Sequence, residues 1–188
     1  MVTAIYRPVA IPPEATVATS AGEALTSNPE RIAFPVSDPQ RIVLPGGDER
    51  RIASVLRVAR PLRYGQFVWA DQAVPPGPSW VLVDLDRQIL SVFRGEHEIG
   101  TGVILYGADS KPTPTGRFPV LERLRDHRSS LYDAAMPYTL RLTHDGVAIH
   151  GSNVVKGMAT HGCIGIPSSF AALVFEALRR GDPVYIVG

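Results

Sequence analysis

Apolar residues in the second half of the chain form the short, alternating runs that are typical of β-strands. Six such segments are rich in Val, Ile, Leu and aromatic residues and are separated by turns that contain Asp, Gly or Pro. They are WVLVDL (80–85), QILSVFRG (88–95), EIGTGVILYG (98–107), TGRFPVLE (115–122), YTLRLTH (138–144) and GVAIHG (146–151), and PVYIV (183–187) follows as a last strand. This spacing predicts a β-sandwich or a barrel-like sheet.

Two other segments have the apolar spacing of a helix. In SSFAALVFEALRRG (168–181), Phe170, Val174 and Leu178 repeat along one face. Ser168 is the expected amino-terminal cap of this helix, Arg179 and Arg180 are expected in its last turn, and Gly181 is expected to end it. In DERRIASVLRVAR (48–60), Ile52, Val55, Leu56 and either Val58 or Ala59 are spaced for one face behind Asp48 as cap, with Pro61 as the stop.

These patterns predict a mostly β domain with one late α-helix packed on the sheet, preceded by an irregular amino-terminal extension. The Pro-Gly-rich stretch AVPPGPSW (73–80) marks the boundary. Residues 1–75 are therefore expected to be an extension or linker with short strands and one helix, and residues 76–188 the main domain. Within the extension, residues 1–30 are predicted to be an extended arm, because Pro, Ala, Thr and Ser recur there without a period.

The composition is that of a folded protein without a strong charge. Of 188 residues, 45% are hydrophobic and 20% are charged, and 19 Lys and Arg balance 18 Asp and Glu to a formal net charge of +1. Such a chain has no overall field to draw it to nucleic acid, so we expect no nucleic-acid partner. We also expect no membrane span, since the longest dense apolar run is FAALVF (170–175) and a span needs about 18 residues. Pro8, Pro12 and Pro13 interrupt the amino-terminal segment, and no signal peptide is visible there.

The single cysteine lies in ATHGCIGIP (159–167), between Gly162 and Ile164. A lone cysteine can be a small buried hydrophobe, a metal ligand or a nucleophile. Gly162 and Gly165 predict a tight turn around Cys163, on which backbone N–H groups can converge on an oxyanion. This context favours the nucleophile.

A thiol nucleophile needs a base, and two histidines are near in sequence. His150 ends a predicted strand and can aim its ring into a cleft, whereas His161 is only two residues from the sulfur and can line the site. Zinc is an alternative, because His144, His150, His161 and Cys163 are all ligand types. The spacings H-x5-H and H-x-C and the lack of a second cysteine speak against a closed zinc site, so we expect no metal and no cofactor.

These residues carry a resemblance to a known family. The segment AIHGSNVVKGMATHGCIGIP (148–167) resembles the active-site signature of the L,D-transpeptidase catalytic domain (YkuD-like): a His-Gly, a loop, then Ser/Thr-His-Gly-Cys. PTPTGRF (112–118) is similar to that family's Pro-Thr-Pro-x-Gly segment, and WVLVDLDRQILSVFRG (80–95) to its opening hairpin. The resemblance covers the chain from about residue 80 to its end.

The resemblance implies a bacterial enzyme that acts on peptidoglycan stem peptides in the periplasm or cell envelope. By position, Cys163 is the nucleophile, which cleaves after the third stem residue through a thioester, and His150 is the general base. Gly151 is expected to orient His150 through its carbonyl, the N–H groups of Gly162 and Cys163 to hold the oxyanion, and His161 and Thr160 to shape the site. An amine on a second stem, or on a protein, would accept the acyl group. The alternatives are an L,D-carboxypeptidase or amide hydrolase on the same fold, and a peptidoglycan-binding module without turnover.

One departure from the family and five weaker candidates complete the picture. The family often has Arg or Asn two residues after the cysteine, where this chain has Gly165. Arg141 and Arg117 are candidate replacements for anchoring substrate, although a strand arginine is usually solvated or salt-bridged. Tyr132, Met136 and Tyr138, in the loop before a strand, are candidate substrate contacts that would roof the cleft.

Overall fold

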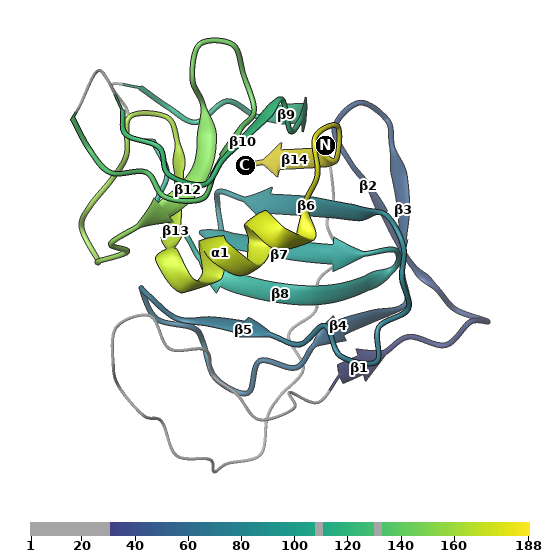
Figure 1. Ribbon diagram of the computed structural model, residues 1–188. Coiled ribbons are helices and arrows are strands. Elements are labelled where there is room, and N and C mark those ends of the chain that lie inside the picture. The colour runs from purple at the N-terminus through teal and green to yellow at the C-terminus, as the bar shows by residue number, and fades with distance from the viewer. Residues whose placement is uncertain (1–30, 108–110, 130–132) are drawn as a thin grey trace.

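The computed structural model describes residues 31–107, 111–129 and 133–188, which contain fourteen strands and one helix (Figure 1). The strands are β1 (Arg31–Ala33), β2 (Gln40–Val43), β3 (Glu49–Ile52), β4 (Ser54–Leu56), β5 (Phe67–Trp69), β6 (Ser79–Asp84), β7 (Ile89–Arg94), β8 (His97–Val103), β9 (Gly116–Pro119), β10 (Glu122–Leu124), β11 (Thr139–Arg141), β12 (Ala148–Ser152), β13 (Ile164–Pro167) and β14 (Pro183–Val187), and the helix is α1 (Ser168–Ala177). The extended arm expected at 1–30 lies outside the described residues.

The strands form three sheets. The largest has eight strands in the order β1-β4-β8-β7-β6-β14-β9, with β5 paired to β8. A four-stranded sheet, β10-β11-β12-β13, stands beside it, and β2 and β3 form a separate hairpin. The predicted fold class, mostly β with one late helix, is confirmed. In the described residues no helix has the length and apolar character needed to cross a bilayer.

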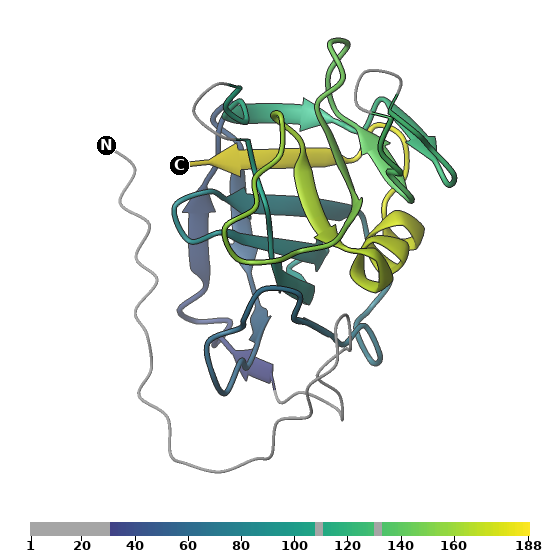
Figure 2. The ribbon, with the colours of Figure 1, turned by 90° about the vertical axis from the view of Figure 1, so that its left-hand side faces the viewer.

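The main core lies where α1 packs between the two larger sheets (Figures 1 and 2). The ring of Phe170 stacks on Phe67 at 4.9 Å between centroids and meets Trp69 edge-on at 6.2 Å. Gly100 and Gly102 of β8 leave room for this ring, because a Cβ atom would lie 3.2 Å from it at the first position and 2.7 Å at the second. Since α1 follows β13 without a break, this packing also fixes the end of β13.

The helix differs from the prediction at both ends: it begins one residue earlier and ends earlier than expected. Pro167, not Ser168, is its amino-terminal cap, and no side chain caps it. The helix ends at Ala177, and Leu178 has an extended backbone (φ −104°, ψ 146°) and is fully buried. Arg179 and Arg180 therefore lie beyond the helix, and Gly181 lies in the turn before β14 with φ +91°. The burial of Leu178 in the core overrides the local helical periodicity.

The helix predicted over 48–60 is wrong: the segment forms β3 and β4. Gly46 and Gly47 have φ values of +87° and +80°, which suit the turn of the β2–β3 hairpin. β4 lies between β1 and β8 in the large sheet, and Leu56 is 2% exposed. Strand pairing with distant partners thus decides the structure of a segment whose apolar spacing suits either element.

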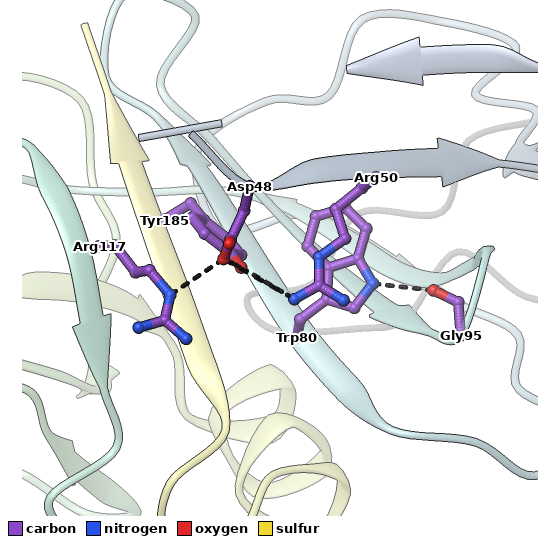
Figure 3. Close-up of polar contacts among 6 residues, drawn as sticks. All are labelled: Asp48, Arg50, Trp80, Gly95, Arg117 and Tyr185. Atoms are coloured by element: carbon purple, nitrogen blue, oxygen red, sulfur yellow. Dashed lines mark hydrogen bonds and ion pairs between the residues drawn. The ribbon is translucent and has the colours of Figure 1, made fainter. Parts of the chain in front are cut away.

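A cluster of polar side chains connects the β2–β3 hairpin to the outer face of the large sheet (Figure 3). The hydroxyl of Tyr185, on β14, donates to the carboxylate of Asp48 and accepts from Nη2 of Arg50 at 2.9 Å. Arg117 Nε donates to the same carboxylate at 3.0 Å, and the Arg50 guanidinium lies 5.7 Å from the ring centroid of Trp80. The hydrogen bond from Tyr185 is the largest cause that lowers the pKa of Asp48. Residues 31–75 therefore belong to the same structure as the rest: β1, β4 and β5 are strands of the large sheet, and the β2–β3 hairpin packs on it. The boundary at 75/76 stays a prediction.

Candidate active site

Two adjacent strands of the four-stranded sheet carry the predicted base and nucleophile. β12 and β13 run parallel, with Ile149 paired to Ile164 and His150 paired to Gly165. Cys163 comes directly before β13, two residues before Gly165. Paired residues of parallel strands share a face, so His150 lies on the face of position 165, and the chain that enters β13 there comes from the bend that holds Cys163.

His150 is held as a neutral base by its surroundings. Its side chain is buried, at 9% exposed, and its Nδ1 atom lies 2.9 Å from the carbonyl oxygen of Gly151. A carbonyl can only accept, so Nδ1 carries the proton and the lone pair of Nε2 is available. Burial is the main cause that lowers the pKa of His150; the Gly151 carbonyl opposes it, and His127 adds to it. The expected contact between His150 and the Gly151 carbonyl is present, and its catalytic role stays a prediction.

Cys163 is half-buried, and its surroundings favour the protonated thiol. Burial is the largest cause that raises the pKa of its thiol, against the smaller lowering effects of the Ala148 backbone and Lys111. The Sγ atom donates to the Gly146 carbonyl at 3.6 Å. Within the described residues, the hydrogen bond of the thiol goes to this carbonyl and not to the imidazole. The nucleophile therefore has to lose its proton to a base before it attacks.

The turn before Cys163 is held by hydrogen bonds from two sides. The hydroxyl of Thr160 donates to the carbonyl of Cys163, and the amide of Thr160 donates to Tyr106 O at 3.0 Å. Gly162 has φ +97°, a left-handed conformation that favours glycine, as the sequence predicted for a tight turn. Its carbonyl accepts from Thr113 Oγ1 at 3.1 Å. The side chain of His161 is exposed, at the rim of this turn.

Gly151 lies where a side chain has little room. Its amide donates to Pro137 O at 2.8 Å. A Cβ atom would lie 2.9 Å from Pro137 Cγ and 3.0 Å from Ser168 Oγ. Gly151 is thus needed for close packing of β12 against both Pro137 and the start of α1, in addition to its contact with His150.

The structure does not gather the predicted substrate contacts over the cysteine. Met136 is buried, and its carbonyl accepts from Thr139 Oγ1 at 2.7 Å. Tyr138 packs edge-on against Phe175 of α1 at 5.9 Å. Arg141 forms an ion pair with Glu122 at 2.9 Å, and Arg117 pairs with Asp48 as described above. Tyr132 lies outside the described residues. Substrate contact by these side chains stays a prediction.

The missing side chain at position 165 has a steric reason. A Cβ atom at Gly165 would lie 3.1 Å from Ser152 Cβ and 3.3 Å from Ser152 Oγ, and 3.6 Å from Leu105 Cβ. The amide and carbonyl of Gly165 both bond to Leu105, at 2.9 and 2.8 Å. Ser152 therefore occupies the space beside Gly165, and a long polar side chain there would displace it.

Two neighbours of the site were missed by the sequence analysis. Thr113 is buried, at 5% exposed, and contacts the carbonyl of Gly162, although PTPTGRF was singled out only for its resemblance. Lys111 supplies positive charge close enough to lower the pKa of Cys163. For Thr113, the available sequence signal was a polar residue between two prolines, Pro112 and Pro114. No three His, Cys, Asp or Glu side chains of the described ranges form a group that suits a metal ion.

The chain resembles known proteins over the part that holds this site. The sequence model of the YkuD family, the L,D-transpeptidase catalytic domain, matches residues 78–186. L,D-transpeptidase 1 of Mycobacterium tuberculosis is 30% identical over 124 residues, which are 57% of this chain and 49% of that protein. The chain thus spans about half the length of the curated relatives it matches.

Solved structures show the same fold. An L,D-transpeptidase from Stackebrandtia nassauensis superposes with a TM-score of 0.55 at 22% identity, over 63% of this chain and 60% of that chain. The LD transpeptidase LdtMt1 in complex with imipenem superposes with a TM-score of 0.53 at 25% identity, over 58% of each chain. The family match covers more than half of the sequence and includes both His150 and Cys163. The chain belongs to the YkuD family of L,D-transpeptidase catalytic domains.

Proposed function

We propose that this protein is a cysteine L,D-transpeptidase that acts on peptidoglycan stem peptides, with Cys163 as nucleophile and His150 as general base. The observation that carries the proposal is the hydrogen bond from His150 Nδ1 to the Gly151 carbonyl, 2.9 Å long, on the strand paired with the one that follows Cys163. It leaves Nε2 as the proton acceptor, in an imidazole kept neutral by burial.

The reaction follows from these two groups. His150 Nε2 takes the proton from Sγ, the sulfur attacks the carbonyl carbon of the third stem residue, and the carbonyl electron pair moves onto oxygen. The C–N bond then breaks, and the leaving D-alanine amine departs with the proton from the imidazolium. The product is a thioester on Cys163. In the second half, an acceptor amine gives a proton to His150 and attacks the thioester carbonyl. The C–S bond then breaks, and the imidazolium returns the proton to the sulfur, which restores the thiol.

The oxyanion that forms in each half needs hydrogen-bond donors. The left-handed turn at Gly162 makes the amides of Gly162 and Cys163 the candidates, because such a turn brings successive N–H groups to one side. His161 and Thr160 would shape this turn. Because backbone N–H groups stabilise the oxyanion, the proposal requires no charged side chain for its stabilisation.

The substrate and the place of action are part of the proposal. The family name implies a peptidoglycan substrate, and hence work in the periplasm or cell envelope. The acceptor is an amine on a second stem or on a protein. If water takes its place, the same thioester makes the protein an L,D-carboxypeptidase, and a protein that never forms the thioester would be a peptidoglycan-binding module.

A muropeptide that carries a tetrapeptide stem separates these alternatives. Incubation with the wild type, followed by chromatography and mass spectrometry, is expected to give the crosslinked dimer with release of D-alanine. Tripeptide without dimer would indicate the hydrolase, and unchanged muropeptide would contradict the enzyme proposal. Cys163→Ala, which keeps the turn but removes the sulfur, is the matched control and should give no product.

A further inference from the structure

A buried threonine outside the catalytic signature is tied to the turn that presents the cysteine. Thr113, 5% exposed, lies in the segment before β9, 49 residues from Gly162. Its Oγ1 atom is 2.9 Å from the amide nitrogen of Gly107 and 3.1 Å from the carbonyl oxygen of Gly162. The amide can only donate and the carbonyl can only accept, so the hydroxyl accepts from Gly107 and donates to Gly162.

The backbone of Gly107, which donates to this hydroxyl, lies against the cysteine turn. A Cβ atom at Gly107 would lie 2.8 Å from both Cα and N of Gly162 and 2.2 Å from Lys111 O. Gly107 and Thr160 also form a parallel bridge, supported by the amide of Thr160 on Tyr106 O at 3.0 Å. Residues 105–107, which follow β8, and the cysteine turn are therefore in direct backbone contact, and the Thr113 hydroxyl bonds to both.

The hydrogen bond from the Thr113 hydroxyl to the Gly162 carbonyl also sets the direction of the Cys163 N–H group. The peptide unit between Gly162 and Cys163 is planar and trans, so its C=O and N–H point in opposite directions. The Thr113 hydroxyl holds the C=O, and so turns the N–H of Cys163 away from Thr113. This N–H is one of the two proposed oxyanion donors, and Gly162, with φ +97°, has no side chain that would otherwise restrain the unit.

We propose that Thr113 is a positioning residue for acyl transfer: by holding the Gly162 carbonyl, its hydroxyl orients the Cys163 amide towards the oxyanion. This inference rests on the proposed cysteine chemistry. It predicts that Thr113 affects steps that develop negative charge on a carbonyl oxygen, and leaves the reactivity of the thiol itself unchanged.

The experiment compares two reactions of the same sulfur in Thr113→Val, which keeps the shape and loses the hydroxyl. Imipenem acylates by opening its lactam, so a C–S bond forms, the C–N bond breaks, the nitrogen takes the proton, and an oxyanion forms on the way. Iodoacetamide alkylates by displacing iodide and forms no oxyanion. Intact mass against time gives both rates, and the imipenem series gives the first-order acylation constant and the half-saturating concentration separately.

We expect the acylation constant of Thr113→Val to fall by about 10- to 100-fold, below the loss of a direct oxyanion donor, which is about 100- to 1,000-fold. The half-saturating concentration and the alkylation rate should stay within about twofold of wild type. Thr113→Ser, which restores a hydroxyl, should recover most of the acylation constant. Thr115→Val changes an exposed threonine of the same segment and is the matched control; it should behave as wild type.

Two results would overturn the inference. One is Thr113→Val acylating within twofold of wild type. The other is acylation and alkylation falling together in Thr113→Val and in the smaller Thr113→Ala, because the residue would then support the turn without orienting the amide. Wild type that is alkylated but never acylated would contradict the proposed function, and the inference with it, and is distinguished from both by the wild-type arm alone.

Discussion

Gly151→Ala tests the packing between β12, the strand that carries His150, and its surroundings. The new Cβ atom would lie 2.9 Å from Pro137 Cγ, 3.0 Å from Ser168 Oγ and 3.1 Å from Pro137 O. The φ of Gly151 lies outside the left-handed region, so alanine suits the backbone and the strain is steric. The neighbours must move by a few tenths of an ångström. This movement would disturb the hydrogen bond from the Gly151 amide to Pro137 O, which is 2.8 Å long.

The magnitude follows from two opposing effects. Overpacking a well-filled site costs about 1–3 kcal/mol. Replacing glycine by alanine at a permitted conformation returns about 0.4–1 kcal/mol, because the unfolded chain loses freedom. The free energy of unfolding should therefore fall by about 1–2 kcal/mol, which at a urea slope of about 2 kcal/mol per molar moves the midpoint down by about 0.5–1 M. Because the shift also moves the carbonyl that orients His150, acylation by imipenem should slow by about tenfold.

Urea unfolding followed by tryptophan fluorescence measures the stability change, and intact mass measures acylation. Gly77→Ala is the matched control, since the nearest atoms to its Cβ would be 3.5 and 3.6 Å away, in ordinary contact. The control should be as stable as wild type or slightly more so. The reasoning is refuted if Gly151→Ala unfolds at the same urea concentration as Gly77→Ala and is acylated at the wild-type rate.

Two further predictions concern titration. Because burial raises the pKa of Cys163, the rate of alkylation by iodoacetamide should rise with pH through a midpoint above the ordinary thiol value of 9.0; a midpoint near neutral pH would instead show a resting thiolate–imidazolium pair. Burial also raises the pKa of Glu98, whose carboxylate accepts from the Leu56 amide at 2.8 Å. The folded state thus holds this proton more tightly than the unfolded state. The free energy of unfolding should fall as pH rises from the ordinary 4.5 through the raised value. Glu98→Gln should flatten that part of a urea-unfolding pH series, and an unchanged slope would contradict the assignment.

The strands whose sequences alternate between apolar and polar residues could be predicted from the local sequence alone. β6 and β7 are joined by a short turn, as predicted. β12 also forms where the sequence predicts a strand, but it continues past His150 to Ser152, because Gly151 and Ser152 pair with β13. β13 was not predicted, because Gly165 and Pro167 interrupt its four residues and it forms only against β12 and Leu105. The segment 48–60 was assigned wrongly because its spacing suits two elements, and only the glycine turn at 46–47 and the distant partner β8 distinguish them.

The candidate site also contains some residues that the sequence could predict and others that it could not. Cys163, His150 and the Gly162 turn could be found from the sequence, because the residues lie close together in the chain and their types suit one chemistry. Thr113 could not, because its role comes from a contact with Gly162 across 49 residues. The steric reason for Gly165 was equally hidden, since Ser152 is its neighbour only through the parallel pairing of β12 and β13.

The central claim is that Cys163 forms a covalent acyl intermediate, and trapping that intermediate tests it directly. Wild type and Cys163→Ala are each incubated with imipenem, the intact masses are measured, and the modified peptide is sequenced by mass spectrometry. The account predicts one adduct with the full mass of imipenem, because the opened lactam keeps its amine, located on Cys163 and missing from Cys163→Ala. Wild type without an adduct, or an adduct of equal yield on Cys163→Ala, would contradict it.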